Sequence, residues 1–154
     1  MDVYVAQFKN CLQAVYKKNP FINLLEMKIT ALEAGRITMT MPVVFGKHTN
    51  VHQIAHGGAL ASLADTAMGL ACGTLDQKVV TMDMNINFIR GAKPDQLVYA
   101  HAEVIHQGKK TLVVEAAVVD SEEKLLAKSR GTFFVVGRFS EGSDFDECNE
   151  VQGD

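Results

Sequence analysis

The sequence predicts an α+β domain in which one antiparallel sheet curls around a single buried helix. The pattern of apolar residues gives the order helix, two strands, helix, four strands, with short connections between consecutive strands. Strands joined by such short connections pair antiparallel. The helix in the middle of the chain is apolar on every side, and a helix of that kind has to be covered on every side.

The first part of the chain predicts a helix followed by a hairpin. An amphipathic helix is expected over residues 3–18, because apolar residues recur there at helical spacing: Val5, Phe8, Leu12 and Val15. Asn19-Pro20 ends this helix, since proline disfavours helical geometry in the residue before it. From residue 21 to residue 41 the period changes to two, which predicts two strands joined by a turn at residues 33–36 and closed by Pro42.

The rest of the chain predicts the buried helix and four more strands. The helix is expected over residues 57–72, where only Ser62, Asp65 and Thr66 are polar. Alternation and short turns place the strands at residues 80–90, 97–106, 111–120 and 125–136. In the first of these strands one face is expected to carry Met82, Met84, Ile86 and Phe88. The polar connection before the helix, about a dozen residues long, is of the length that is usually functional.

Length and composition are those of one ordinary globular domain. The chain has 154 residues, of which 47% are hydrophobic and 21% charged. We assign residues 1–140 to a single domain and residues 141–154 to an acidic tail that is expected to be disordered. No apolar run is long enough to cross a membrane, and the N-terminus lacks the pattern of a signal peptide. Cys11, Cys72 and Cys148 form no paired motif, which favours a reducing compartment such as the cytoplasm.

Charge is unevenly distributed along the chain. The net charge is −3, but the last fourteen residues carry six of the 18 acidic groups and no Lys or Arg. The other residues therefore hold 15 basic against 12 acidic groups, a formal charge of +3. A mildly basic body suits a phosphorylated small molecule, whereas no stretch is basic enough to predict nucleic-acid binding.

Three histidines four residues apart raise the question of a metal site. His48, His52 and His56 would share one face of a helix, and residues 52–56 differ by one letter from the H-E-x-x-H motif of zinc proteases. That motif needs a glutamate as general base, and Gln53 cannot accept a proton. Nothing else in the segment predicts a helix. We therefore predict no metal ligand here and interpret His48 and His52 as solvated loop residues.

The residues His56-Gly57-Gly58 are typical of a helix start that approaches a ligand. Glycine exposes the free N–H groups of the first turn, and the helix dipole helps them to hold negative charge on a carbonyl oxygen. Tight packing of the helix is the alternative reason for the two glycines.

Asp65 is the second candidate, because a carboxylate in an apolar helix is costly to bury unless it is hydrogen-bonded or functional. Such carboxylates serve as general bases and nucleophiles. The alternative is a structural aspartate bonded to Thr66 or to a neighbouring chain. Gly57 and Asp65 lie eight residues apart, roughly 12 Å along one helix. A reaction that uses both would therefore need two subunits, as in a two-fold dimer.

With these residues in place, the chain resembles a known family. Three segments carry the likeness: Asn50 followed after five residues by His56-Gly57-Gly58, the apolar helix with Asp65, and the strand Val80-Thr81-Met82-Asp83-Met84-Asn85-Ile86. They are similar to the hotdog-fold acyl-CoA thioesterases of the PaaI and human thioesterase-superfamily type, over about residues 35–137. The resemblance implies a hotdog fold, in which the sheet wraps the long helix. It also implies homodimers paired edge to edge, which commonly stack into homotetramers.

The resemblance implies roles for individual residues. Asp65 would attack the thioester or activate water, the Gly57 N–H would bind the oxyanion, and His56 would orient the thioester carbonyl. Asn50 would position water or the nucleophile from the subunit that supplies Gly57, and Thr81 would assist Asp65. The coenzyme A part of the substrate would contact Asp83, Phe88, Arg90, Lys93, Lys109 and Lys110. For the four basic residues a solvated surface is the alternative. No metal and no other cofactor is implied.

The sequence therefore predicts hydrolysis of an acyl-CoA to a carboxylic acid and coenzyme A. Two alternatives stay open. In the first, His56 and Asp65 form the acid–base pair of an enoyl-thioester hydratase on the same fold. In the second, the chain is a non-catalytic acyl-CoA sensor. Asp65 argues against the sensor, because a binding pocket alone would gain from leucine at that position.

Overall fold

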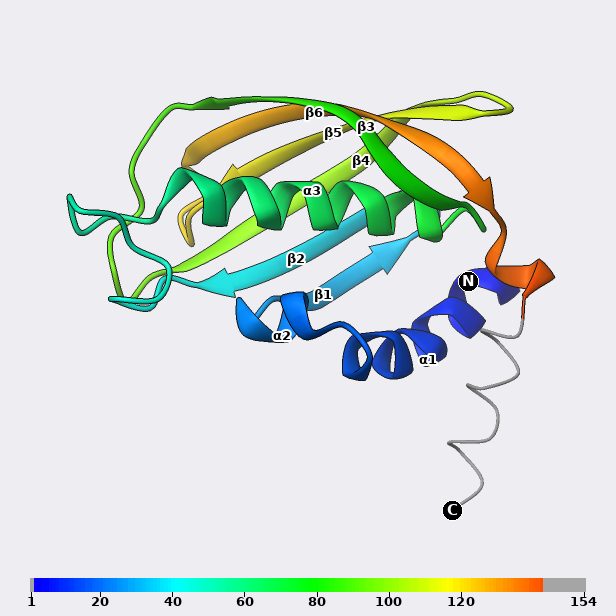
Figure 1. The fold of residues 1–154 in the computed structure, drawn as a ribbon, viewed down its shortest axis with the longest axis horizontal. Coiled ribbons are helices and arrows are strands. Elements are labelled where there is room, and N and C mark those ends of the chain that lie inside the picture. The colour runs from blue at the N-terminus through cyan, green and yellow to red at the C-terminus, as the bar shows by residue number, and fades with distance from the viewer. Residues whose placement is uncertain (1, 143–154) are drawn as a thin grey trace, which may run out of the picture.

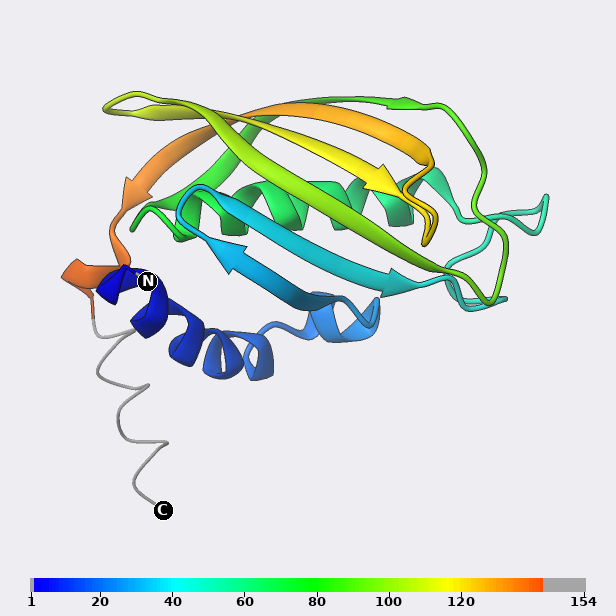
Figure 2. The ribbon, with the colours of Figure 1, turned by 180° about the vertical axis from the view of Figure 1, so that it is seen from behind.

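A six-stranded antiparallel sheet wraps around one long helix in the computed structural model, which describes residues 2–142 (Figure 1). The strand order is β1-β2-β4-β5-β6-β3. The strands are β1 (Lys28–Glu33), β2 (Arg36–Pro42), β3 (Lys78–Phe88), β4 (Leu97–Gln107), β5 (Thr111–Val119) and β6 (Leu125–Gly137). The helices are α1 (Val3–Lys17), α2 (Pro20–Leu24), α3 (Gly57–Gly73) and the short 3-10 helix η1 (Phe139–Glu141). The long helix α3 lies in the curve of the sheet, as the view from behind also shows (Figure 2).

The predicted fold class, an α+β domain with a sheet curled around a helix, is confirmed. Residues 143–154 of the predicted acidic tail lie outside the described part of the chain. Within residues 2–142, no helix combines the length and the apolar character that a membrane span requires.

Two helices precede the sheet, and one of them was not predicted. α1 confirms the amphipathic helix, and the buried residues of its predicted apolar face are Val5, Phe8 and Leu12; the side chain of Val15 lies outside the described part. α2 corrects the prediction of an extended segment from residue 21 onward. The side chain of Asn19 accepts a hydrogen bond from the Ile22 N–H at 3.3 Å, and Pro20 occupies the first turn, where its missing N–H costs nothing. The Asn-Pro pair that ends α1 therefore also starts α2.

Helix α3 packs closely against the inner face of the sheet. Its side chains on that side are fully buried and include Leu63, Ala64, Ala67, Met68 and Ala71. The opposite side of the helix is only partly buried and carries Ala61, Ser62, Asp65, Thr66 and Gly69. The expectation that the helix is covered on every side is therefore wrong for a single chain, because the sheet curls around one side only. We call the partly buried side the open side of α3.

Strand β3 forms one edge of the sheet and exposes apolar side chains. Those at this edge are Val80, Met82 and Phe88, which are 53%, 61% and 53% exposed. Met84 and Ile86 pack partly against the core, so the predicted single apolar face of this strand is divided. A register shift between Thr81 and Asp83 accounts for the exposure of the residue between them, since a bulge changes the face to which side chains point. An exposed apolar edge is a template for pairing with another strand.

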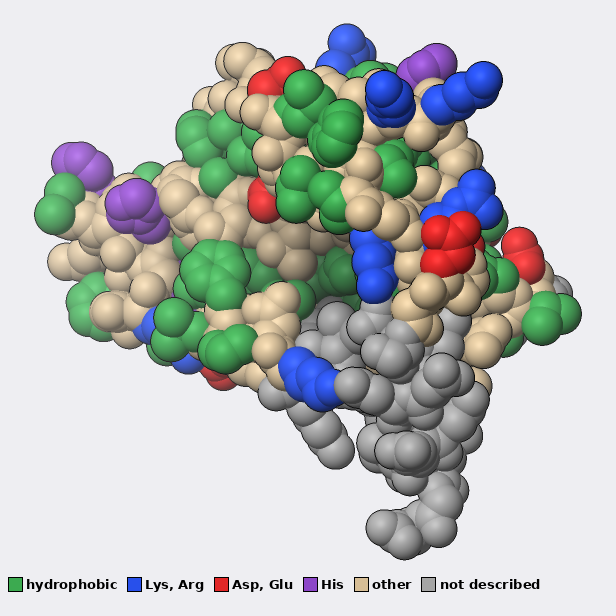
Figure 3. Space-filling model, turned by 45° about the vertical axis from the view of Figure 1, so that its right-hand side comes forward, with side chains coloured by type: hydrophobic (Ala, Val, Ile, Leu, Met, Phe, Trp, Pro, Cys, Tyr) green, Lys and Arg blue, Asp and Glu red, His purple; other side chains and the backbone are tan. Residues whose placement is uncertain are grey.

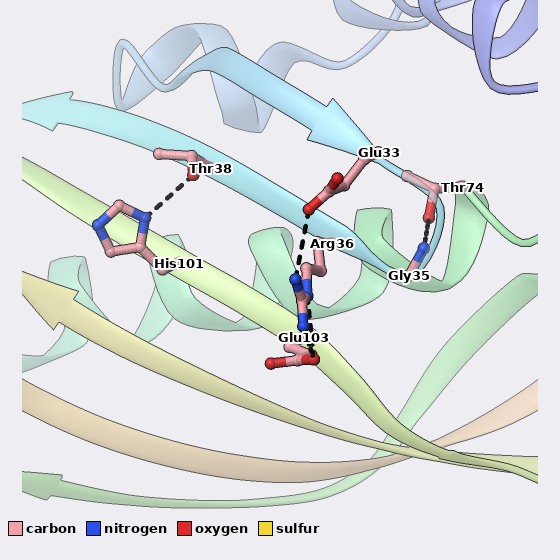
Figure 4. Close-up of polar contacts among 7 residues, drawn as sticks. All are labelled: Glu33, Gly35, Arg36, Thr38, Thr74, His101 and Glu103. Carbon is pink, nitrogen blue, oxygen red and sulfur yellow. Dashed lines mark hydrogen bonds and ion pairs between the residues drawn. The ribbon is translucent and has the colours of Figure 1, made fainter. Parts of the chain in front are cut away.

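The outer face of the sheet, away from α3, is covered by ion pairs and polar contacts. Arg36 on β2 contacts Glu103 on β4 at 2.6 Å and Glu33 on β1 at 3.6 Å (Figure 4). On the same strands a hydrogen bond joins Thr38 to His101 at 3.0 Å. Exposed ion pairs of this kind contribute about 0–1 kcal/mol each. They mark a solvated face, so a site for an apolar substrate or an apolar partner is expected on the helix side instead.

His48 is buried rather than solvated, which corrects the prediction for this loop residue. It is only 1% exposed. Its Nδ1 accepts a hydrogen bond from the Val44 N–H at 3.0 Å, and its Nε2 donates to the Leu25 carbonyl at 2.9 Å. The ring thus ties the loop before α3 to the segment after α2. His52 is exposed, as predicted.

Replacing His48 by leucine should lower the free energy of unfolding by about 1–3 kcal/mol, because it leaves the partly buried Val44 N–H and Leu25 carbonyl without their partners. His52→Leu, on the same loop, is the matched control and should change this free energy by less than about 0.5 kcal/mol, since His52 is exposed. Urea unfolding of the wild-type protein and the two variants measures both differences. Equal stability of the two variants would contradict the structural role of His48.

Candidate active site

Helix α3 begins at backbone groups suited to binding an oxygen atom. His56 is its N-cap: the ring Nδ1 accepts a hydrogen bond from the Gly58 N–H at 2.8 Å, and the carbonyl accepts from Ala59 and Leu60. The Gly57 N–H has no acceptor among residues 2–142. This amide at the positive end of α3 can therefore donate to a ligand. Because Nδ1 of His56 accepts, the neutral ring carries its proton on Nε2, which can donate as well.

The Gly57 amide lies beside a cavity of about 320 Å³ at the edge of the sheet. The loop before α3 and the end of β3 supply the other walls of this cavity. An added Cβ at position 57 would stand 3.1 Å from Phe88 Cζ, so the half-exposed ring of Phe88 would have to shift by a few tenths of an ångström to admit it. The structure thus brings together four of the residues predicted from the sequence: Asn50, Gly57, Phe88 and Arg90.

Asn50 also shapes the loop that leads to α3. Its Oδ1 accepts hydrogen bonds from the N–H groups of His52 at 2.9 Å and Ile54 at 3.4 Å. Its backbone carbonyl accepts from Gln53, a residue with a φ of 60°. Because the side-chain oxygen is used within the loop, the Nδ2 amide is the part of Asn50 that can serve a ligand.

Asp65 lies about two turns further along α3, on its open side. The Thr81 hydroxyl on β3 donates a hydrogen bond to the Asp65 Oδ1 at 2.7 Å. Its partner is thus a residue on the edge strand rather than Thr66, the alternative considered from the sequence. One carboxylate oxygen is anchored, and Oδ2 can face a substrate. Asp65 and Thr81 line a second cavity, of about 510 Å³, which extends toward α2 and η1.

The two cavities are separate within one chain. Among the described residues, none lines both of them. The eight residues from Gly57 to Asp65 correspond to roughly 12 Å along the helix axis. A single chain therefore does not present the Gly57 amide and the Asp65 carboxylate to the same carbonyl group.

The other predicted contacts for coenzyme A lie elsewhere on the surface. Lys109 lines a third cavity, of about 440 Å³, near the turn between β4 and β5. Lys93, Lys110 and Asp83 are exposed and line none of these three cavities. The structure therefore does not gather these four residues around the Gly57 amide of their own chain. In the described part of the chain, no group of three or more His, Cys, Asp or Glu residues is arranged to hold a metal ion.

Sequence reasoning missed the residues that close the second cavity on its outer side. Phe21 and Ile22 come from α2, and Phe139 comes from η1. These residues lie near the two ends of the chain, far in sequence from Asp65, and the fold brings them beside it. No local pattern marks them, because only tertiary packing makes them neighbours of the carboxylate.

Comparison with known proteins identifies the family. A family model described as "Thioesterase superfamily" matches residues 52–127. The acyl-coenzyme A thioesterase PaaI of Escherichia coli K12 is 34% identical to the chain over 124 residues, which cover 80% of this chain and 88% of that protein. The chain belongs to the thioesterase superfamily. The residues matched by the family model include every predicted site residue of this thioesterase except Asn50.

Solved structures show that this thioesterase shares its fold with PaaI. The E. coli PaaI structure aligns with a TM-score of 0.81 at 32% identity and covers 86% of this chain and 96% of that one. A hypothetical thioesterase from Streptococcus pneumoniae TIGR4, solved with coenzyme A, aligns with a TM-score of 0.70 at 30% identity and covers 73% and 90%. The resemblance to PaaI-type thioesterases is confirmed, and with it the hotdog fold and the enzyme class, a thioester hydrolase.

Proposed function

We propose that this thioesterase hydrolyses acyl-coenzyme A to a carboxylic acid and free coenzyme A, at sites shared between two subunits. One observation carries the proposal: helix α3 holds both the Asp65 carboxylate, which Thr81 anchors, and the Gly57 N–H, which has no acceptor within residues 2–142. The relatives support the substrate class, since one is named an acyl-coenzyme A thioesterase and another was solved with coenzyme A.

Strand β3 offers a geometry for sharing the site. Thr81, in the first half of β3, donates a hydrogen bond to Asp65. Phe88, at the other end of β3, lies where a side chain at position 57 would be. Antiparallel pairing of two β3 edges about a two-fold axis near residue 84 would bring Thr81 opposite the partner's Phe88. Asp65 would then face the partner's Gly57, and symmetry would give a second site. The same pairing would cover the exposed apolar side chains of this edge.

The homodimer is therefore the minimal active unit in this proposal. The family resemblance extends it to a homotetramer of stacked dimers. The outer face of the sheet carries ion pairs, and the centres of interfaces are poor in charged residues. We therefore expect the subunits to meet through the helix side.

The proposed reaction needs only side chains and one backbone group. The Gly57 N–H of one chain donates to the thioester carbonyl oxygen and holds the negative charge that develops there. The partner's Asp65 either takes a proton from a water that attacks the carbonyl carbon, or attacks that carbon itself to form a mixed anhydride, which water then hydrolyses to the free acid. The carbon–sulfur bond breaks, and the coenzyme A thiolate leaves and takes up a proton. His56 through Nε2 and Asn50 through Nδ2 donate to the carbonyl oxygen or to the water. No metal or redox cofactor enters these steps.

The coenzyme A part of the substrate is proposed to lie across the end of β3. Phe88 and Arg90 line the cavity beside Gly57, and the Arg90 guanidinium suits a phosphate. More distant contacts are proposed for Asp83, Lys93, Lys109 and Lys110. We also propose a cytoplasmic location; the buried thiol of Cys72, which forms no disulfide, fits a reducing compartment.

The first test follows thiol release from a panel of acyl-CoAs by protein treated with EDTA. We expect turnover of at least one member without added metal. Cys72 should not react with the reagent that detects the released coenzyme A thiol, because its own thiol is fully buried and burial raises its pKa to about 12. Binding without thiol release would favour a non-catalytic sensor instead. Activity that returned only with added zinc would contradict the metal-free mechanism.

Gly57→Pro removes the proposed oxyanion donor with little other change. Proline is accepted at the first position of a helix, and His56 already has the extended geometry that precedes proline, with φ −62° and ψ 134°. Gly57→Ala is the matched control, because it adds a Cβ next to Phe88 but keeps the N–H. We expect kcat of Gly57→Pro to fall about 10²- to 10³-fold below that of Gly57→Ala. Equal rates for the two variants would refute the role of the amide.

Asp65→Asn should lower kcat by about 10²- to 10⁴-fold while acyl-CoA still binds. A mixed dimer of one Asp65→Asn chain and one Gly57→Pro chain contains one intact shared site. Refolding the two inactive proteins together should therefore restore about a quarter of the wild-type activity, since about half of the dimers are mixed and each has one working site. A verified mixed dimer without activity would rule out the shared site.

A further inference from the structure

The groove beside Asp65 has walls that the proposed chemistry does not use. It is the cavity of about 510 Å³ on the open side of α3, and its apolar lining includes Gly69, Leu70, Val79 and Phe133. The space-filling view shows a hollow near the middle of this side of the molecule, with hydrophobic side chains on either side of it (Figure 3). Among the described residues that line the groove there is no Lys, no Arg and no second carboxylate.

We propose that this groove holds the acyl group of the substrate, and that Gly69, together with Phe21 and Ile22 of α2, sets the length of acyl chain accepted. The inference rests on the proposed function, because that function places the thioester carbonyl beside Asp65. An acyl chain that starts at Asp65 and follows the open side of α3 meets Gly69 one turn later, since residues i and i+4 share a helix face. The substrate class is then an apolar acyl group, linear or aromatic, without a charge at its far end.

Gly69 is not required by the fold. Its φ is not positive, and an added Cβ would meet only Phe133 Cε1, at an ordinary 3.7 Å. Gly73, one turn later, is different, because a Cβ there would stand 2.6 Å from the buried ring of Phe8. Glycine inside a helix is disfavoured relative to alanine. The missing side chain at position 69 therefore serves the groove: it leaves the path beyond Asp65 open.

The outer wall of the groove comes from segments outside the family core. Phe21 and Ile22 belong to α2 and Phe139 to η1, whereas the thioesterase superfamily model covers residues 52–127. Ile22 is fixed by packing, at 3% exposure, while Phe21 stands at the rim, at 50% exposure. The family core thus carries Gly57 and Asp65, and the flanking segments close the groove and limit the acyl chain.

Gly69→Leu fills the groove and tests the inference. Each methylene buried in an apolar site changes kcat/KM by a factor of about four, so excluding three methylenes lowers it about sixtyfold. We expect the ratio of kcat/KM for decanoyl-CoA to kcat/KM for butyryl-CoA to fall at least about tenfold in Gly69→Leu. Phe21→Ala, which widens the rim, should raise the same ratio about twofold or more.

Gly137→Leu is the matched control, because position 137 does not line the groove and an added Cβ there would meet only Lys78 Cδ, at 3.9 Å. It should keep the wild-type ratio. An unchanged ratio in Gly69→Leu would overturn the inference and leave the proposed function standing. A wild-type protein that hydrolyses no acyl-CoA would overturn the proposed function itself. Should Gly69→Leu fail to fold, as judged by circular dichroism, Phe21→Ala tests the inference instead, since truncating a half-exposed ring leaves the core intact. An unchanged ratio of decanoyl-CoA to butyryl-CoA turnover in Phe21→Ala would then overturn it.

Discussion

The close contact between α3 and the concave face of the sheet determines where the Gly57 amide and the Asp65 carboxylate lie. It depends on small side chains, which let the backbones of helix and strands approach each other. The fully buried alanines of this contact are Ala64, Ala67 and Ala71 on the helix and Ala100, Ala116 and Ala127 on the sheet. Because the helix is held along its whole length, the Gly57 amide and the Asp65 carboxylate keep a fixed spacing on one rigid element.

Hydrophobic periodicity predicted the fold because burial enforces it over long segments. The four C-terminal strands and both long helices begin and end within two residues of their predicted bounds. α2 escaped prediction, since five residues are too few to show a period and its start depends on the cap supplied by Asn19. His48 escaped for another reason: its partners are the Val44 N–H and the Leu25 carbonyl, backbone groups that leave no trace in the sequence.

The candidate site was predictable where a residue breaks a local rule. Asp65 interrupts an apolar helix, and Gly57 stands in a glycine pair at a helix start, so both were visible in the sequence. What surrounds them was visible only in part, because it depends on tertiary structure. Without the family resemblance, nothing near Asp65 indicated that its partner would be Thr81. The loop before α3 likewise keeps Gln53 at a φ of 60°. This left-handed conformation costs about 1 kcal/mol, and the hydrogen bonds of Asn50 stabilise the loop that contains it.

Because Gly57 and Asp65 lie too far apart on one helix to act together, damaged alleles of this protein fall into two kinds under the shared-site proposal. A chain that has lost one of the two residues still contributes the other to a site with a normal partner, so one of the two sites in that dimer works. A chain that has lost both spoils both sites of every pair it enters. With equal expression of normal and doubly damaged chains, only about a quarter of the dimers are active. The first kind of allele lowers activity in proportion to its dose, whereas the second is dominant-negative.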